Sequence, residues 1–192
     1  MRLLLGLLFS LATAALIGLG TTWFALTQGA AFGGVTIGAW TVRPKVGTAG
    51  IDPYSHAIVA RSGELPIGSG DGLAFFAYGD DGGRPLDGRC DVLVSGITPQ
   101  ARYWTMTLYD LQGRLIANSV QRQGFTSQEI TRRADGTFEI IIGPRARPGN
   151  WLPTGGIERY VLVLRLYDTS VGVATRTGRD APMPVVAQRA CL

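Results

Sequence analysis

RYWTMTLY, at residues 102–109, alternates regularly between apolar and hydroxyl-bearing side chains. Successive side chains of a β-strand point to opposite faces of the sheet. Trp104, Met106 and Leu108 therefore share one face of this segment, and the tyrosines and threonines between them share the other. The alternation predicts a strand with its apolar face buried and its polar face exposed.

The same kind of pattern recurs along the chain. Residues 160–167, YVLVLRLY, form the strongest candidate, with a tyrosine and three leucines on one face. Further strands are expected at 36–42, 73–78, 91–97, 114–117 and 137–142, separated by Gly, Asp and Pro residues that favour turns. About seven short strands predict a mainly β domain, folded as a jelly-roll-like antiparallel β-sandwich.

One short helix is expected before these strands. Asp52 can cap its start, Pro53 suits its first position, and Gly63 can end it. His56, the only histidine of the chain, lies on this helix. We expect His56 to be an exposed helix residue without a catalytic role. Tyr54, Ile58 and Arg61 fall on another face.

A long uncharged stretch opens the chain, since no charged residue occurs from Leu3 to Val42. About 20 helical residues span the hydrocarbon core of a bilayer. We therefore expect a transmembrane anchor at residues 1–27, a connector at 28–35 and the β domain at 36–192.

A cleavable signal peptide is the alternative to an anchor. Ala12-Thr13-Ala14 offers the small residues that a cleavage site needs. The apolar run continues beyond it to Trp23 and Phe24, which suit the interfacial aromatic belt of a membrane helix. The uncleaved anchor is the interpretation we favour.

Two cysteines occur, Cys90 within the domain and Cys191 near the C-terminal end. A pair without CxxC spacing or histidine partners makes a poor zinc site and suits a disulfide. Such a bridge closes a loop of about 100 residues and contributes roughly 2–4 kcal/mol. Because disulfides persist in oxidising compartments, we expect the domain to lie outside the cytoplasm. Two unrelated buried thiols are the alternative.

Other function classes find little support. The net charge is +4, but the arginines are scattered, whereas a nucleic-acid binder gathers them into a stripe. We see no GxSxG motif, no GxxxxGK[ST] loop and no paired carboxylates. Asp80, Asp81 and Asp87 share a Gly-rich loop that could offer calcium ligands, although a solvated hairpin is favoured. We expect no catalytic residue, no metal and no cofactor.

Two separated motifs resemble a bacterial family. The first is YWTMTLYD at 103–110, and the second is PGNWLP at 148–153 followed by LVLRLY at 162–167. Over residues 72–186 the chain is similar to the family catalogued as domain of unknown function 1214. The resemblance implies a jelly-roll-like domain and no agreed reaction. Longer members carry a second domain of unknown function, 1254, for which we expect no room here.

Arg165 stands in the middle of an apolar strand, where its charge needs an acceptor. It could hold an acidic ligand, with Trp151 as a stacking surface and Tyr103 as a hydrogen-bonding wall. Alternatively it pins the loop that contains Asn150 and Trp151, which is the interpretation we favour.

These observations predict a single-pass protein of the bacterial inner membrane with its C-terminal domain in the periplasm. The domain would serve as a non-enzymatic ligand-binding or assembly module, with the membrane and either an envelope protein or a small ligand as partners. The alternative is an enzyme that acts on a small acidic or carbohydrate-like substrate near Arg165, with Asp110 as a further site residue.

Overall fold

The computed structural model describes residues 2–28, 34–62, 66–68, 70–171 and 181–191. The helices in these residues are α1 (Arg2–Gln28) and α2 (Pro53–Ser62). The strands are β1 (Val35–Ile37), β2 (Trp40–Val42), β3 (Gly72–Ala77), β4 (Cys90–Gly96), β5 (Ala101–Tyr109), β6 (Gly124–Thr126), β7 (Phe138–Gly143), β8 (Asn150–Pro153), β9 (Val161–Thr169) and β10 (Val185–Cys191).

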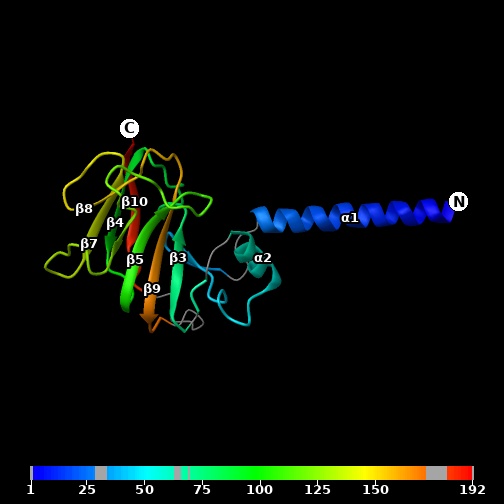
Figure 1. The fold of residues 1–192 in the computed structure, drawn as a ribbon, viewed down its shortest axis with the longest axis horizontal. Coiled ribbons are helices and arrows are strands. Elements are labelled where there is room, and N and C mark those ends of the chain that lie inside the picture. The colour runs from blue at the N-terminus through cyan, green and yellow to red at the C-terminus, as the bar shows by residue number, and fades with distance from the viewer. Residues whose placement is uncertain (1, 29–33, 63–65, 69, 172–180, 192) are drawn as a thin grey trace.

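The strands form two sheets (Figure 1). One sheet has six strands in the order β1-β2-β3-β9-β5-β6, and the other has four in the order β10-β4-β7-β8. Neighbouring strands are antiparallel except β7 and β8, which are parallel. The chain is therefore mainly β, as predicted, but the second sheet is mixed and not purely antiparallel.

The predicted alternation builds a core between the sheets. Trp104, Met106 and Leu108 of β5 are 0–2% exposed. The ring of Trp104 lies 5.4 Å from that of Phe138 on β7, so the two sheets share one apolar layer. Fully burying a large apolar side chain contributes about 1.5–3 kcal/mol. The jelly-roll connectivity stays a prediction.

The segment 36–42 is a hairpin and not the single strand predicted. Gly38 has φ 57°, a left-handed conformation that glycine adopts without strain. The turn that it makes separates β1 from β2, which pair with each other. The backbone N–H of Ala39 donates to Asp81 Oδ1 at 2.9 Å, so a distant carboxylate holds this turn.

The predicted strand at 114–117 is also absent from the described structure. Only an isolated bridge joins Leu115 to Tyr109. Asn118 then closes a loop, because its Oδ1 accepts a hydrogen bond from the Arg122 N–H and its Nδ2 donates to the Arg122 carbonyl. The loop returns the chain to β5 as the short strand β6.

The prediction of a loop at Asn150 and Trp151 was wrong, because these residues begin β8. Asn150 is 9% exposed, and its Nδ2 donates to the carbonyls of Thr131 and Glu139 at 2.8 Å each. Its Oδ1 accepts from the Thr131 N–H at 2.9 Å. The amide thus anchors β8 beside β7 at an edge of the sheet.

The short helix α2 begins as predicted. Asp52 Oδ1 accepts hydrogen bonds from the backbone N–H groups of Tyr54 and Ser55. These bonds satisfy two donors that a helix start leaves unpaired. Gly63, its predicted end, lies outside the described residues.

Candidate functional site

Helix α1 projects away from the β domain, beside α2 (Figure 1). Residues Arg2–Thr27 are long and apolar enough to cross a membrane, and none of the span's most apolar part is buried within the structure. Leu3, Phe9 and Leu16 are 76–86% exposed. A bilayer is one environment that would cover them, and a signal sequence has the same character.

The two cysteines meet where the last strand, β10, pairs with β4. Cys90 opens β4 and Cys191 ends β10, and the two residues face each other across these antiparallel strands. Their sulfur atoms lie at disulfide distance, and the residues are 101 positions apart in the sequence. This bond is compatible with an oxidising compartment.

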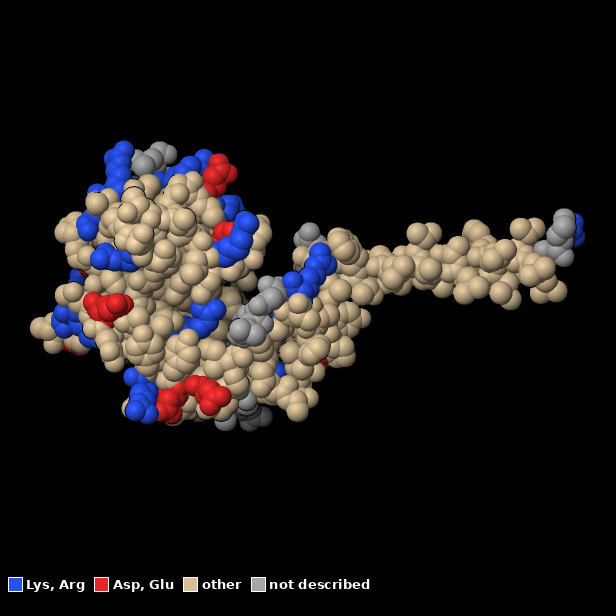
Figure 2. Space-filling view, in the orientation of Figure 1, with Lys and Arg blue, Asp and Glu red and all other residues tan. Residues whose placement is uncertain are grey.

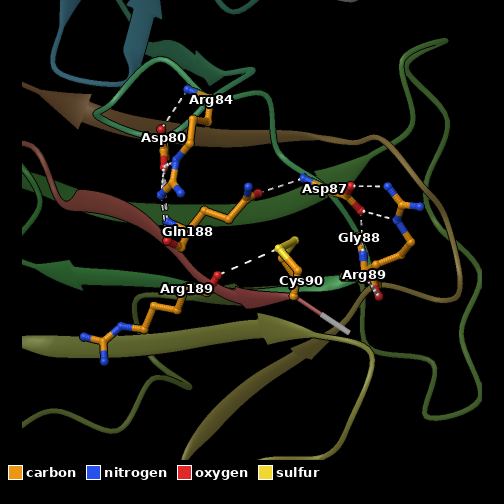
Figure 3. The surroundings of a disulfide bond; sticks show 10 residues. Asp80, Arg84, Asp87, Gly88, Arg89, Cys90, Gln188 and Arg189 are labelled. Carbon is orange, nitrogen blue, oxygen red and sulfur yellow. Dashed lines mark hydrogen bonds and ion pairs between the residues drawn. A yellow bond between two sulfur atoms is a disulfide. The ribbon is translucent and has the colours of Figure 1, made fainter.

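Polar side chains of the segment before β4 hold β10 against the domain (Figure 3). Gln188 Oε1 accepts a hydrogen bond from the Asp87 backbone N–H at 3.0 Å, and the Gln188 carbonyl accepts one from Arg84 Nη2 at 2.8 Å. Asp80 positions Arg84 through a 2.6 Å ion pair. Asp81 Oδ2 accepts from the Val186 N–H at 2.6 Å. The last strand is thus fastened at several points besides the disulfide.

Asp80 and Asp110 build two turns of matching geometry. Oδ1 of Asp80 accepts from the N–H groups of Gly82 and Arg84, and Oδ1 of Asp110 accepts from those of Gln112 and Arg114. In both turns Oδ2 accepts from the arginine Nε, at 2.9 and 2.7 Å. Gly83 and Gly113 occupy equivalent positions with φ 78° and 79°. The carboxylate of Asp110, considered above as a further site residue, therefore accepts hydrogen bonds within its own turn.

These hydrogen bonds also set the protonation of the carboxyl groups. Burial raises the pKa of Asp80, but hydrogen bonds from the Arg84 side chain and backbone outweigh it and leave the pKa below its ordinary value. Hydrogen bonds from the Arg89 side chain lower the pKa of Asp87 to about 2. Asp80 and Asp87 are thus ionised at neutral pH, and all three carboxylates considered as calcium ligands, Asp80, Asp81 and Asp87, already accept N–H donors.

Arg165 lies on the outer face of the six-stranded sheet. It pairs with Ala74 of β3 on one side and Thr105 of β5 on the other, and both neighbours are small. Its Nη1 donates to the Tyr109 hydroxyl at 2.9 Å, and its guanidinium carbon lies 5.2 Å from the centre of that ring. Val163, on the same face, is 2% exposed, as expected beneath a long arginine stem.

Aromatic rings surround this arginine. Tyr103 and Tyr167 pair across β5 and β9 with ring centres 5.9 Å apart. Phe76 of β3 lies on the same face and stacks on Tyr78 at 6.5 Å. Among the described residues, no carboxylate lies within ion-pair distance of Arg165. Figure 2 shows a mostly uncharged surface over β3, β9 and β5.

The four predicted ligand-binding residues fall into two groups. Arg165 and Tyr103 share the outer face of the six-stranded sheet, whereas Asn150 and Trp151 lie on β8 of the other sheet. Trp151 is half-buried, and its Nε1 donates to the Gly143 carbonyl at 3.1 Å. The structure therefore does not bring Trp151 to Arg165. The interpretation that Arg165 pins the segment of Asn150 and Trp151 was wrong, because Arg165 donates to Tyr109.

Other polar groups in the described residues form no evident reaction centre. His56 is exposed on α2. Within the described ranges, no group of three or more His, Cys, Asp or Glu side chains is placed to hold a metal ion. The Tyr160 hydroxyl is buried without a hydrogen-bond partner there, and burial raises its pKa, so it stays protonated.

Two solved protein structures are similar to this chain. The VPA0106 protein from Vibrio parahaemolyticus, a crystal structure, matches with a TM-score of 0.59 and 18% identity, covering 73% of this chain and 36% of its own. A putative uncharacterized protein from Burkholderia cenocepacia matches with a TM-score of 0.44 and 18% identity, covering 64% of this chain and 30% of its own. This chain thus spans about a third of their length. No curated protein matches it.

The protein is thus a β-rich domain preceded by an apolar helix. Its aromatic face consists of Tyr103, Tyr109 and Tyr167 around Arg165. The family model for proteins of unknown function DUF1214 matches residues 71–171, which is more than half of the chain. The protein therefore belongs to the DUF1214 family, as its two motifs predict.

Proposed function

We propose that this protein is a single-pass protein of the bacterial inner membrane whose jelly-roll-like domain works in the periplasm as a non-enzymatic binding module. The observation that carries this proposal is the contrast between α1 and the domain. The apolar side chains of α1 are uncovered, while the domain encloses its own core. Lipid is the solvent that suits such a helix.

The proposed side of the membrane is supported by the cysteines. A bridge between Cys90 and Cys191 persists only where thiols are oxidised. For a bacterial protein anchored in the inner membrane, that compartment is the periplasm. Charge near the ends of α1 adds little, since Arg2 is the one charged residue within it.

The ligand that the aromatic face fits best is an acidic, carbohydrate-like molecule. Half-buried tyrosine rings offer flat apolar contact with hydroxyl groups at their edges. Arg165 brings a positive charge with no carboxylate partner in the described structure, so an acidic group on the ligand would form a charge-assisted hydrogen bond with it. The surface lies around Arg165, Tyr103, Tyr109 and Tyr167.

A binding experiment with matched variants tests this assignment. The full chain in detergent is titrated by calorimetry with an oligogalacturonate hexamer, which is acidic, and with maltohexaose, which is neutral. We expect binding of the acidic oligomer, and a loss of about tenfold or more in Arg165→Gln because a charge-assisted contact disappears. Arg122→Gln is the control, since Arg122 also stacks on a ring, that of Phe125, at a different place.

Equal affinity of the two variants for the acidic oligomer, or no binding by the wild-type chain, would contradict the ligand assignment. Release of reducing ends from either oligomer would instead favour an enzyme that acts on such a substrate near Arg165. Thermal unfolding of each variant checks that the fold is retained.

A further inference from the structure

Helix α2 meets α1 at the end of the apolar span. The guanidinium carbon of Arg61, in the last turn of α2, lies 4.8 Å from the centre of the Trp23 ring. Trp23 is still 62% exposed, so the arginine covers only part of it. Figure 2 shows Lys and Arg side chains where α1 joins the domain.

The length of α1 places this contact at the membrane surface. Twenty residues of α-helix rise about 30 Å, which is the thickness of the hydrocarbon core. An anchor that enters this core at Leu3 therefore leaves it at Trp23. Tryptophan prefers that boundary, where its ring is in contact with apolar chains and its N–H with polar headgroups. Arg61 then lies at the level of the lipid phosphates.

Helix α2 has one buried face and one exposed face. Ser55 and Val59, one turn apart, are 2% and 9% exposed and face inward. Tyr54 and Arg61 stand two turns apart on another face, where Tyr54 is 42% exposed and Arg61 is exposed. An aromatic ring and a cation on one helix face suit the headgroup region of a bilayer.

We propose that α2 lies on the periplasmic surface of the membrane and that Arg61 binds the phosphate of anionic phospholipids, with Tyr54 in the headgroup layer. This inference rests on the membrane anchoring proposed above. The contact would limit how the β domain stands over the bilayer, because α2 lies in the chain between the anchor and β3 and contacts the anchor through Arg61 and Trp23.

Spin labels on the full chain in nanodiscs test this proposal. Because Cys90 and Cys191 are paired, an introduced cysteine is the one free thiol. We would label Tyr54→Cys on α2, Leu11→Cys within α1, and Arg145→Cys in the segment between β7 and β8. Figure 1 shows these two strands on the side of the domain away from α1. Collisions with a water-soluble nickel chelate and with oxygen then report the depth of each label.

In phosphatidylglycerol-containing discs we expect position 11 at the depth of the acyl chains, position 54 at headgroup depth and position 145 in water. Replacing anionic lipid with phosphatidylcholine, or adding Arg61→Gln, should lower the ratio of membrane-contacting to water-exposed label at position 54 about fivefold, the effect of one basic residue near an anionic surface.

Position 54 as water-exposed as position 145 in both lipids, with position 11 in the acyl chains, would overturn the proposal while the anchor stands. Contact that is insensitive to both anionic lipid and Arg61→Gln would overturn the phosphate assignment. Position 11 in water would show that α1 does not span, so the anchoring itself fails.

Discussion

The first and last described elements of the chain are held in opposite ways. β10 is joined to the domain by the Cys90–Cys191 bridge, by N–H groups that donate to Asp80 and Asp81, and by a carbonyl that accepts from Arg84. Helix α1 touches the domain where Trp23 meets Arg61, and its apolar side chains are otherwise uncovered.

This difference indicates what each end faces. Polar groups of β10 have hydrogen-bond partners within the protein, so this strand needs no further partner to be stable in water. Each Å² of apolar surface that the leucines of α1 move from water into an apolar solvent such as lipid lowers the free energy by about 25 cal/mol. Changes to α1 should therefore alter location and leave the fold intact, whereas changes around β10 should alter stability and leave location intact.

The largest effect is expected from charges placed in α1. Leu11→Arg combined with Leu16→Arg adds about 5–7 kcal/mol to the cost of membrane insertion. We expect the protein to leave carbonate-washed membranes while the thermal unfolding of its domain stays unchanged. Leu111→Arg with Leu115→Arg is the control, because these leucines are also 56–58% exposed but lie in the domain. Retention of the α1 variant in membranes would count against the anchor.

The disulfide should give the next largest effect. The double variant Cys90→Ser/Cys191→Ser frees a loop of 101 residues and should lose about 2–4 kcal/mol of unfolding free energy. Denaturant titration of the wild-type and variant proteins without reductant measures the difference. Membrane retention should not change. An unfolding midpoint equal to that of the wild type would mean that the bridge is not formed.

The matched turns separate local from long-range effects. Asp80→Ala removes the carboxylate that accepts from the Gly82 and Arg84 N–H groups and releases the Arg84 side chain that donates to Gln188, for an expected loss of about 2–3 kcal/mol. Asp110→Ala breaks the same bonds within its turn, but in the described part of the chain its turn makes no hydrogen bond to β10, so its loss should be smaller. Equal losses in denaturant titrations would show that the Asp80 turn does not stabilise the last strand.

Acid pH should have the smallest effect. Asp87 has its pKa lowered from 3.8 to about 2 by hydrogen bonds from Arg89, so its ionised form favours the folded state. That contribution is complete above about pH 4 and declines as the pH falls through 2. Asp87→Asn should therefore flatten the pH dependence of stability in this window. A variant whose stability falls with acid as steeply as the wild type would refute the assignment.

The period-two patterns were sufficient to predict most of the sheet. The apolar residues at 104–108 and 162–166 are buried because each strand has one side toward the core, which alternation alone encodes. β8 and the hairpin at Gly38 were missed because their partners are distant. Asn150 binds Thr131 and Glu139, and Ala39 binds Asp81, so neither contact is visible in the local sequence.

The aromatic face was predicted only in part, for a related reason. Alternation placed Tyr103 with Tyr109 and Arg165 with Tyr167, but it did not reveal that β5 and β9 are neighbours. Strand register turns these separate pairs into one surface and makes Tyr109 the partner of Arg165. Trp151 was considered as a stacking surface for a ligand of Arg165, and the structure puts it on the other sheet.

The topology of the two thiols in living cells tests the central claim most directly. Intact spheroplasts are treated with a membrane-impermeant maleimide before and after an impermeant phosphine reductant. A tethered periplasmic domain predicts no label at Cys90 or Cys191 at first and labelling of both after reduction, with no lysis needed. Labelling that requires lysis but no reductant would contradict the account, because the domain would then lie in the cytoplasm with free thiols.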